Sequence, residues 1–328
     1  MTKTKMKYKL IDNQSQDASS FGCLRNIIGQ TEVVKKLNFF INAQAYGKCF
    51  PTVLFSGSHG LGKTFISKKL ASALNRRYIE INCSSLRNSN DFFDWALNTL
   101  SGDSGATVLF DESHALSNEM TNMLLSILNP SDGMINSYQY GEIHYEFNLN
   151  HMNFIFATTD AHEMFPPLKN RCEQIYFHPY EDEAILEMLR LYMKDVQFEC
   201  DIQELIDTCR SRGRDTFLLA ENLNRYLIGN QVYDKVLTDE MWEDFKFIFD
   251  VYPKGLKREE LNLLKVVNEH GPISCANLAL KLMVNQKNVK EELEVRLQEI
   301  GLIASSTRGR IITSEGKKYL ESLKDVVA

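Results

Sequence analysis

The stretch Phe55-Ser-Gly-Ser-His-Gly-Leu-Gly-Lys-Thr64 decides the fold, because it joins an apolar strand to a helix through the pattern G-x-x-x-x-G-K-T. The strand covers residues 52–56, and apolar residues recur at helical spacing over residues 65–74. Glycines let the loop turn its N–H groups onto phosphate oxygens, and the positive end of the helix dipole adds to this anion site. The stretch therefore predicts a phosphate-binding P-loop, with nucleotide contacts from Gly57, Gly60, Leu61, Gly62, Lys63, Thr64 and Phe65.

A second motif lies downstream, where the apolar run Thr107-Val-Leu-Phe110 ends in Asp111 and Glu112. In a parallel sheet beside a P-loop, the carboxyl end of such a strand lies at the nucleotide. Asp111 can there order a Mg²⁺ shell together with the Thr64 hydroxyl, and Glu112 can polarise a water for attack on the γ-phosphate. Solvated acids are the alternative, but the position downstream of a P-loop favours a Walker B motif. ATP and Mg²⁺ are therefore the expected cofactors.

The alternation of strands and helices through residue 177 predicts an α/β fold with a doubly wound parallel sheet. The helix at residues 31–43 is expected to be N-capped by Thr31. The segment 132–149 alternates apolar and polar residues on both sides of a turn-rich centre, which predicts a β-hairpin. The strand that follows ends in Thr158 and Thr159, whose hydroxyls could reach the attacking water or the γ-phosphate.

The rest of the chain predicts two further parts. Residues 182–250 carry helical spacing almost throughout and predict an all-helical lid, which Pro253-Lys-Gly255 ends. Three expected helices and two short strands around Thr307-Arg-Gly-Arg310 then match a winged helix, which can bind DNA or mediate protein contacts. We therefore expect a flexible extension at 1–20, a nucleotide-binding domain at 21–179, the lid at 180–252 and a C-terminal winged-helix domain at 253–328.

Composition restricts the compartment and hints at a partner. The seven cysteines are scattered without a C-x-x-C pair, which favours reduced thiols and a cytoplasmic protein. The sequence contains no run of about 18 apolar residues, so it predicts no membrane-spanning helix. The net charge of −6 divides unevenly, because the residues from Pro253 onward hold 13 basic against 10 acidic side chains. A slightly basic end on an acidic body is compatible with nucleic-acid contact by that end.

Together these features resemble an AAA+ ATPase, and more closely the family of the bacterial Holliday-junction branch-migration motor RuvB. The likeness runs over roughly residues 21 to 320 in the same domain order. Its most specific parts are the P-loop, Asp111-Glu-Ser-His114, the hairpin before Ala157-Thr-Thr159, Pro167-Leu-Lys-Asn-Arg171 and the stretch from Glu299 to Arg310.

The resemblance implies an ATP-hydrolysing homo-hexameric ring that acts on branched or duplex DNA, with a RuvA-like junction-binding protein docking on the hairpin 132–149. It implies Thr158 or Thr159 as sensor 1, and Arg171 as an arginine finger acting on the neighbouring subunit's ATP. It further implies that Arg308 and Arg310 contact the DNA backbone.

Two parts of the family pattern are altered. Ile28 and Gly29 are expected to contribute to nucleotide binding, although the family's Arg-Pro approach to adenine is missing. The sensor 2 pattern Gly-x-x-Arg appears as Gly213-Arg-Asp-Thr216, so the arginine position is occupied by Thr216, and Arg214 is the candidate replacement.

Three functions fit the sequence. The first is an ATPase motor that translocates on branched or duplex DNA, as a RuvB-like helicase. The alternative is a clamp-loader or helicase-loader type of switch, which uses ATP to grip a protein on DNA. A DNA-binding module without turnover is the third, and the intact Lys63, Thr64, Asp111, Glu112 and Arg171 argue against it.

Overall fold

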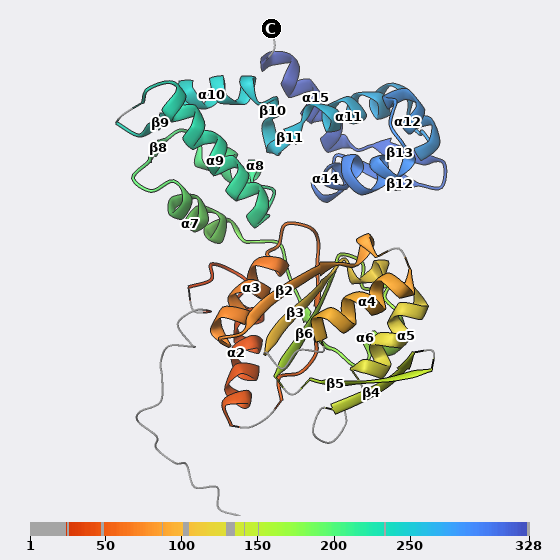
Figure 1. Cartoon of the computed structure of the whole chain (residues 1–328). Helices are drawn as coiled ribbons and strands as arrows, with labels where there is room; N and C mark the ends of the chain where they lie inside the picture. The colour runs from red at the N-terminus through yellow and green to blue at the C-terminus, as the bar shows by residue number, and fades with distance from the viewer. Residues whose placement is uncertain are drawn as a thin grey trace, which may run out of the picture. The chain divides into compact units, whose positions relative to one another are not determined.

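The protein was analysed as a computed structural model (Figure 1), which describes residues 24, 26–46, 49–86, 88–100, 105–128, 135–140, 142–149, 151–232 and 234–326. The chain forms two compact units, Met1–Ala184 and Ile185–Ala328. The predicted four-part division stays a prediction, because the two units divide the chain only once.

A parallel five-stranded sheet forms the centre of the first unit, with strand order β2-β3-β6-β1-β7. The strands β1, β3 and β6 are buried almost throughout, as expected where both faces of a parallel sheet are covered. This arrangement confirms the predicted α/β fold with a doubly wound parallel sheet. The strand bounds are β1 Val53–Ser56, β2 Arg77–Asn82, β3 Ala106–Asp111, β6 Met152–Thr158 and β7 Glu173–Tyr176.

Helices flank this sheet (Figure 1) and pack apolar side chains against it. Their bounds are α2 Thr31–Ala45, α3 Lys63–Ala73, α4 Ser89–Leu100, α5 Asn118–Ile127 and α6 Pro166–Lys169. The predicted N-cap of the first of these was wrong. Thr31 is the first helical residue, and the capping position belongs to Gln30, which has φ 48° and no side-chain cap. The Gln30 amide instead donates to His178 O at 2.7 Å and accepts from His178 N at 3.3 Å, which fastens this turn to the segment after β7.

The predicted hairpin is confirmed over the antiparallel strands β4 (Ile135–Tyr140) and β5 (Ile143–Asn148). Residues 132–134 and 141 of the predicted segment lie outside the described residues. Tyr138 and Tyr145 pack against the Phe93 ring of α4, with centroid distances of 5.8 and 5.1 Å. One side of the hairpin is therefore fixed to the first unit by aromatic contacts.

The lid in the second unit is mainly helical, with helices α7 Asp182–Tyr192, α8 Ile202–Thr208, α9 Gly213–Gly229 and α10 Asp239–Ile248. The expectation of an all-helical lid was wrong in one detail. Two short parallel strands, β8 (Gln197–Glu199) and β9 (Val236–Thr238), pair between these helices. Three-residue strands are too short to show a period of two within a helical pattern.

The winged helix is confirmed, with helices α11 Arg258–His270, α12 Cys275–Leu282, α13 Gln286–Asn288 and α14 Glu294–Glu299 and the hairpin β12 Ile303–Ser306 with β13 Gly309–Ile312. A π-helical turn at Val289–Leu293 joins α13 to α14, so the third predicted helix is a composite. Three further elements were not predicted: the paired strands β10 (Val251–Tyr252) and β11 (Leu256–Lys257), and the C-terminal helix α15 (Ser314–Val326). Within the described residues, no helix is long and apolar enough to span a membrane.

The lid and the winged helix are joined by a buried ion pair. The Arg210 guanidinium donates to both Glu260 oxygens at 2.8 and 2.7 Å, and to Gly255 O at 3.0 and 2.6 Å. The Arg210 and Glu260 side chains are only 10% and 4% exposed. Gly255 has φ +67°, and a Cβ there would lie 2.7 Å from Asp207 O and from Thr208 Cα. The turn at Gly255 thus packs against α8, and the Arg210 guanidinium holds it there.

Candidate nucleotide-binding and catalytic site

The loop between β1 and α3 has the backbone of a phosphate cradle. Gly57, Gly60 and Gly62 have φ values of 153°, 79° and 94°, a region that side chains with a Cβ rarely adopt. A Cβ on Gly57 would also lie 2.7 Å from Phe177 O. The backbone conformation of this loop therefore requires glycines, and that conformation suits the binding of ATP phosphates.

Lys63 is the first residue of α3 and lies inside this loop. Its side chain is largely buried, and its Nζ donates to Gly57 O at 2.6 Å and to Ser58 O at 2.9 Å. A buried ammonium held by loop carbonyls is a point charge placed for β- and γ-phosphate oxygens. Thr64 is half-buried beside it, where its hydroxyl could serve Mg²⁺, and Phe65 is 52% exposed.

Tyr180 is a site residue that the sequence did not reveal. A Cβ on Gly29, which has φ +66°, would lie 2.6 Å from Tyr180 Cδ1. The Tyr180 hydroxyl donates to Leu61 O at 3.0 Å. This buried ring therefore connects the turn at Ile28 and Gly29 to the P-loop. Nothing local in the sequence indicates a contact across 119 positions.

Asp111 is the last residue of β3, which β6 separates from the P-loop strand β1, and it is partly buried. Burial raises the pKa of its carboxyl, although the Glu112 N–H, which donates to Asp111 Oδ1 at 3.1 Å, acts in the opposite direction. A carboxylate that water solvates poorly is stabilised by a divalent cation, so the residue present here fits Mg²⁺.

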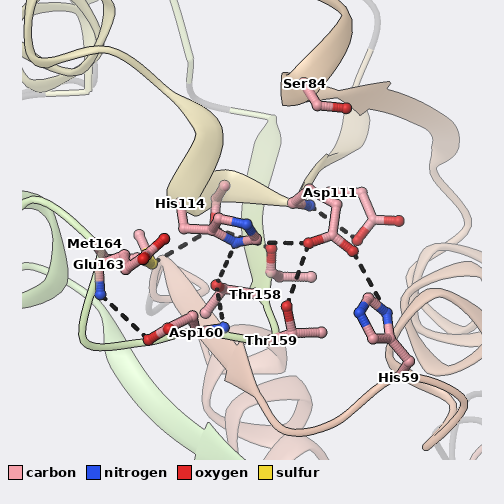
Figure 2. A network of polar contacts seen from close by, with 12 residues as sticks. His59, Ser84, Asp111, His114, Thr158, Thr159, Asp160, Glu163 and Met164 are labelled. Atoms are coloured by element: carbon pink, nitrogen blue, oxygen red, sulfur yellow. Dashed lines mark hydrogen bonds and ion pairs between the residues drawn. The ribbon is translucent and has the colours of Figure 1, made fainter. Parts of the chain in front are cut away.

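The Glu112 carboxylate contacts three polar side chains, Thr159, His114 and His59, which Figure 2 labels. Its Oε2 is 3.5 Å from both Thr159 Oγ1 and His114 Nδ1, and its Oε1 is 3.8 Å from His59 Nδ1 of the P-loop. Its backbone has φ 52°, which is uncommon for a residue with a side chain. The carboxylate is thus presented between the P-loop and the end of β6, as a group that orients water must be.

The structure separates the two threonines that the sequence left equivalent. Thr159 is the one whose hydroxyl faces Glu112. Thr158 is fully buried, its Oγ1 lies 2.9 Å from His114 Nδ1, and it accepts the Asp160 N–H at 3.0 Å. Thr159 therefore faces the Glu112 carboxylate and Thr158 contacts His114, and the sensor 1 role of either threonine stays a prediction.

Arg171 follows α6 and is exposed. Its Nη1 donates to Leu125 O at 3.0 Å, and it forms no ion pair with any described residue. An intrachain salt bridge would be another use for an exposed arginine, and none is found among the described residues; the role of Arg171 in a neighbouring subunit stays a prediction.

The altered sensor 2 pattern opens α9 in the second unit. Thr216 is fully buried, and its hydroxyl donates to Arg212 O at 2.8 Å, so the hydroxyl is already bonded at the start of its own helix. Arg214 is exposed on the first turn of α9. Its role at the nucleotide stays a prediction.

The two wing arginines are not equivalent. Arg308 is exposed, and its side chain has no partner among the described residues. Arg310 donates from Nε and Nη2 to the Glu294 carboxylate at 2.7 and 2.8 Å, and this pairing raises the pKa of its guanidinium. The charge and the planar fork of Arg310 are thus already matched by Glu294, whereas Arg308 is exposed, and the contact of either arginine with DNA stays a prediction.

Comparison with known proteins gives two family matches. Residues 53–180 match the ATPase family associated with various cellular activities (AAA), and residues 253–321 match the RuvB C-terminal winged helix domain.

Several relatives match most of the chain. The Holliday junction branch migration complex subunit RuvB of Mycoplasma pneumoniae is 23% identical over 300 residues, 90% of this chain and 95% of its own. The corresponding subunit of Fervidobacterium nodosum is 26% identical, over 90% and 87% of the two chains. The structure of the Thermotoga maritima RuvB Holliday junction branch migration motor superposes with a TM-score of 0.74 at 24% identity, covering 90% of this chain and 95% of that one.

Proposed function

The chain is a diverged RuvB-like AAA+ ATPase, and from this premise we propose that it is an ATP-driven ring motor that migrates branch points in DNA. The observation that carries the proposal is the combination in one chain of a complete P-loop and Walker B site with a winged helix of the RuvB kind. A clamp-loader type of switch would need the first feature but not the second. The winged helix therefore favours the motor.

Different residues of the first unit would contact the phosphates, the Mg²⁺ ion and the attacking water. When bound, MgATP supplies the transferable phosphoryl group. Lys63 would hold the β- and γ-phosphates, and Thr64 with Asp111 would hold Mg²⁺. Glu112 would orient the attacking water, since its carboxylate already lies between the P-loop and the Thr159 hydroxyl.

We propose that the ring is a homo-hexamer in which Arg171 acts on the neighbour's nucleotide. An exposed arginine without an acidic partner in the described part of the chain can supply a guanidinium to charge developing on the phosphoryl group. Duplex or branched DNA would be contacted by the wing through Arg308.

A RuvA-like junction-binding protein would dock on the hairpin β4–β5, where Ile135 and Ile143 are 52% and 57% exposed. The cytoplasmic location also stays a prediction.

The test is migration of a synthetic four-way junction. Wild-type protein with ATP should convert a labelled junction into its two duplex products, with and without an added junction-binding protein. Glu112→Gln should bind ATP but turn it over at least about a hundredfold more slowly, because the water loses its orienting carboxylate. Lys63→Ala, which removes the phosphate-binding charge, is the matched variant that should lose nucleotide binding itself. Turnover without any movement of junctions or duplexes would favour the loader.

A further inference from the structure

We propose that His114 is a positioning residue for ATP hydrolysis, which links the buried hydroxyl of Thr158 to the carboxylate of Glu112. The inference rests on the proposed function, because it takes Glu112 as the group that orients the attacking water. His114 touches neither phosphate nor water in this scheme; it acts through Glu112.

One ring nitrogen of His114 makes both contacts. Nδ1 lies 2.9 Å from Thr158 Oγ1 and 3.5 Å from Glu112 Oε2, and the side chain is 24% exposed (Figure 2). The first distance is that of a hydrogen bond, whereas the second is a longer polar approach. The ring is therefore anchored at Thr158, and the Glu112 carboxylate is the partner that is free to move closer or away.

The anchor itself is fixed by the backbone. The Thr158 hydroxyl accepts the Asp160 N–H at 3.0 Å, and as a hydroxyl it still has one proton and one lone pair to offer His114. The contact with the Glu112 carboxylate requires the Nδ1–H form of the ring, and the Thr158 hydroxyl has a lone pair left to accept from that N–H. Because Thr158 is fully buried at the end of β6, its hydrogen bond fixes the position of the His114 ring relative to the central sheet.

The turn that carries Glu112 is fastened to the same strand. Ser113 is buried, and its hydroxyl donates to Ala157 O at 3.0 Å, one residue before Thr158. Glu112 has a left-handed backbone, which costs a side-chain-bearing residue about 1 kcal/mol and persists only where the surroundings enforce it. Ser113 and His114 each attach this turn to β6, through Ala157 O and the Thr158 hydroxyl.

A histidine that merely fills space at the end of β6 would have a different signature. Its loss would lower stability and nucleotide affinity together. A positioning residue acts on the orientation of Glu112, so its loss should lower kcat and leave KM for ATP unchanged. A displacement of a catalytic group by about 1 Å is enough to cost about a hundredfold in rate.

The test compares His114→Phe, which keeps a flat ring but loses the nitrogen, with His114→Asn, whose amide lies near the position of Nδ1. We expect His114→Phe to lower kcat by about 10- to 100-fold with KM within about twofold of wild type. His114→Asn should recover most of the rate. Affinity for a fluorescent ATP analogue and thermal unfolding report whether each variant is folded.

A double-variant cycle with Thr158→Val tests the link itself. If both side chains act through one hydrogen bond, the double variant His114→Phe, Thr158→Val should be about as slow as the slower single variant, and the two losses should not multiply. Multiplying losses, an unchanged kcat in His114→Phe, or an equal loss in His114→Asn would each overturn the proposal. Should His114→Phe not fold, His114→Asn and Thr158→Val still decide, because a fast Thr158→Val would overturn it.

ATP turnover is measured with and without a four-way junction. Unimpaired turnover in Glu112→Gln would refute the proposed function at its base. A wild-type protein that turns over ATP but moves no junction would refute the motor, and would leave the His114 result to be judged on turnover alone.

Discussion

The unequal wing arginines give a quantitative prediction for DNA binding. Each phosphate that a protein neutralises on B-DNA adds about 0.9 to the slope of log K against log salt concentration. Arg308 is exposed and its side chain is unpaired within the described residues, so Arg308→Ala should reduce this slope by about 0.9. Between 50 and 200 mM salt, the affinity of the variant should therefore fall about 3.5-fold less than that of the wild type.

Arg310→Ala should behave differently, because the Arg310 charge is already matched inside the protein. Its removal leaves the Glu294 carboxylate, whose side chain is 8% exposed, without its partner. Breaking a buried ion pair costs about 3 to 5 kcal/mol, and we expect about 3 kcal/mol here, since the Arg310 side chain keeps 17% exposure. The salt slope should stay at the wild-type value.

The assay is fluorescence anisotropy with a labelled duplex at several salt concentrations, beside denaturant unfolding of each variant. Glu294→Met with Arg310→Met is the matched control, because it removes both charges and should recover much of the stability while keeping the slope. The reasoning is refuted if Arg310→Ala lowers the slope as much as Arg308→Ala does, or if Arg308→Ala leaves it unaltered.

Two further predictions concern Arg171 and Glu260. Arg171→Ala should bind ATP nearly normally but hydrolyse it poorly, Arg171→Lys should also be damaged because it lacks the planar fork, and mixing with Lys63→Ala chains should restore part of the ATPase activity. Mixed rings that never exceed the sum of the two variants would exclude an arginine finger in trans. Glu260→Gln should destabilise the second unit by about 3 kcal/mol, because the Arg210 guanidinium is left buried with its charge unmatched. An unfolding midpoint within error of the wild type would contradict this.

Local pattern was enough to predict the elements of the nucleotide site and the hairpin. The glycines of the P-loop, the apolar run that ends at Asp111 and the alternation of β4 and β5 all express their structure within about ten residues. The parallel sheet was predicted from the order of these elements, because a helical crossover between strands is the usual connection of a parallel pair.

Contacts between distant residues were beyond such reasoning. Tyr180 reaches Leu61, His114 meets Thr158, and Arg310 pairs with Glu294. In each case the partner is set by three-dimensional packing, and no spacing in the sequence marks it. The wing shows the consequence most clearly, since Thr307-Arg-Gly-Arg310 offers two arginines of equal appearance of which one is neutralised.

The joint at Gly255 also has a mechanical meaning. A Pro-Lys-Gly sequence between two domains has the composition of a hinge, but here Arg210 clamps the Gly255 carbonyl, and there is no space beside the turn for even a methyl group. The Arg296 guanidinium adds a second fastening, with its Nη2 donating to Asp207 O and Lys254 O at 3.3 and 3.2 Å. A rotation of the lid would therefore also move the winged helix, because the connection between them is held in place and cannot bend freely.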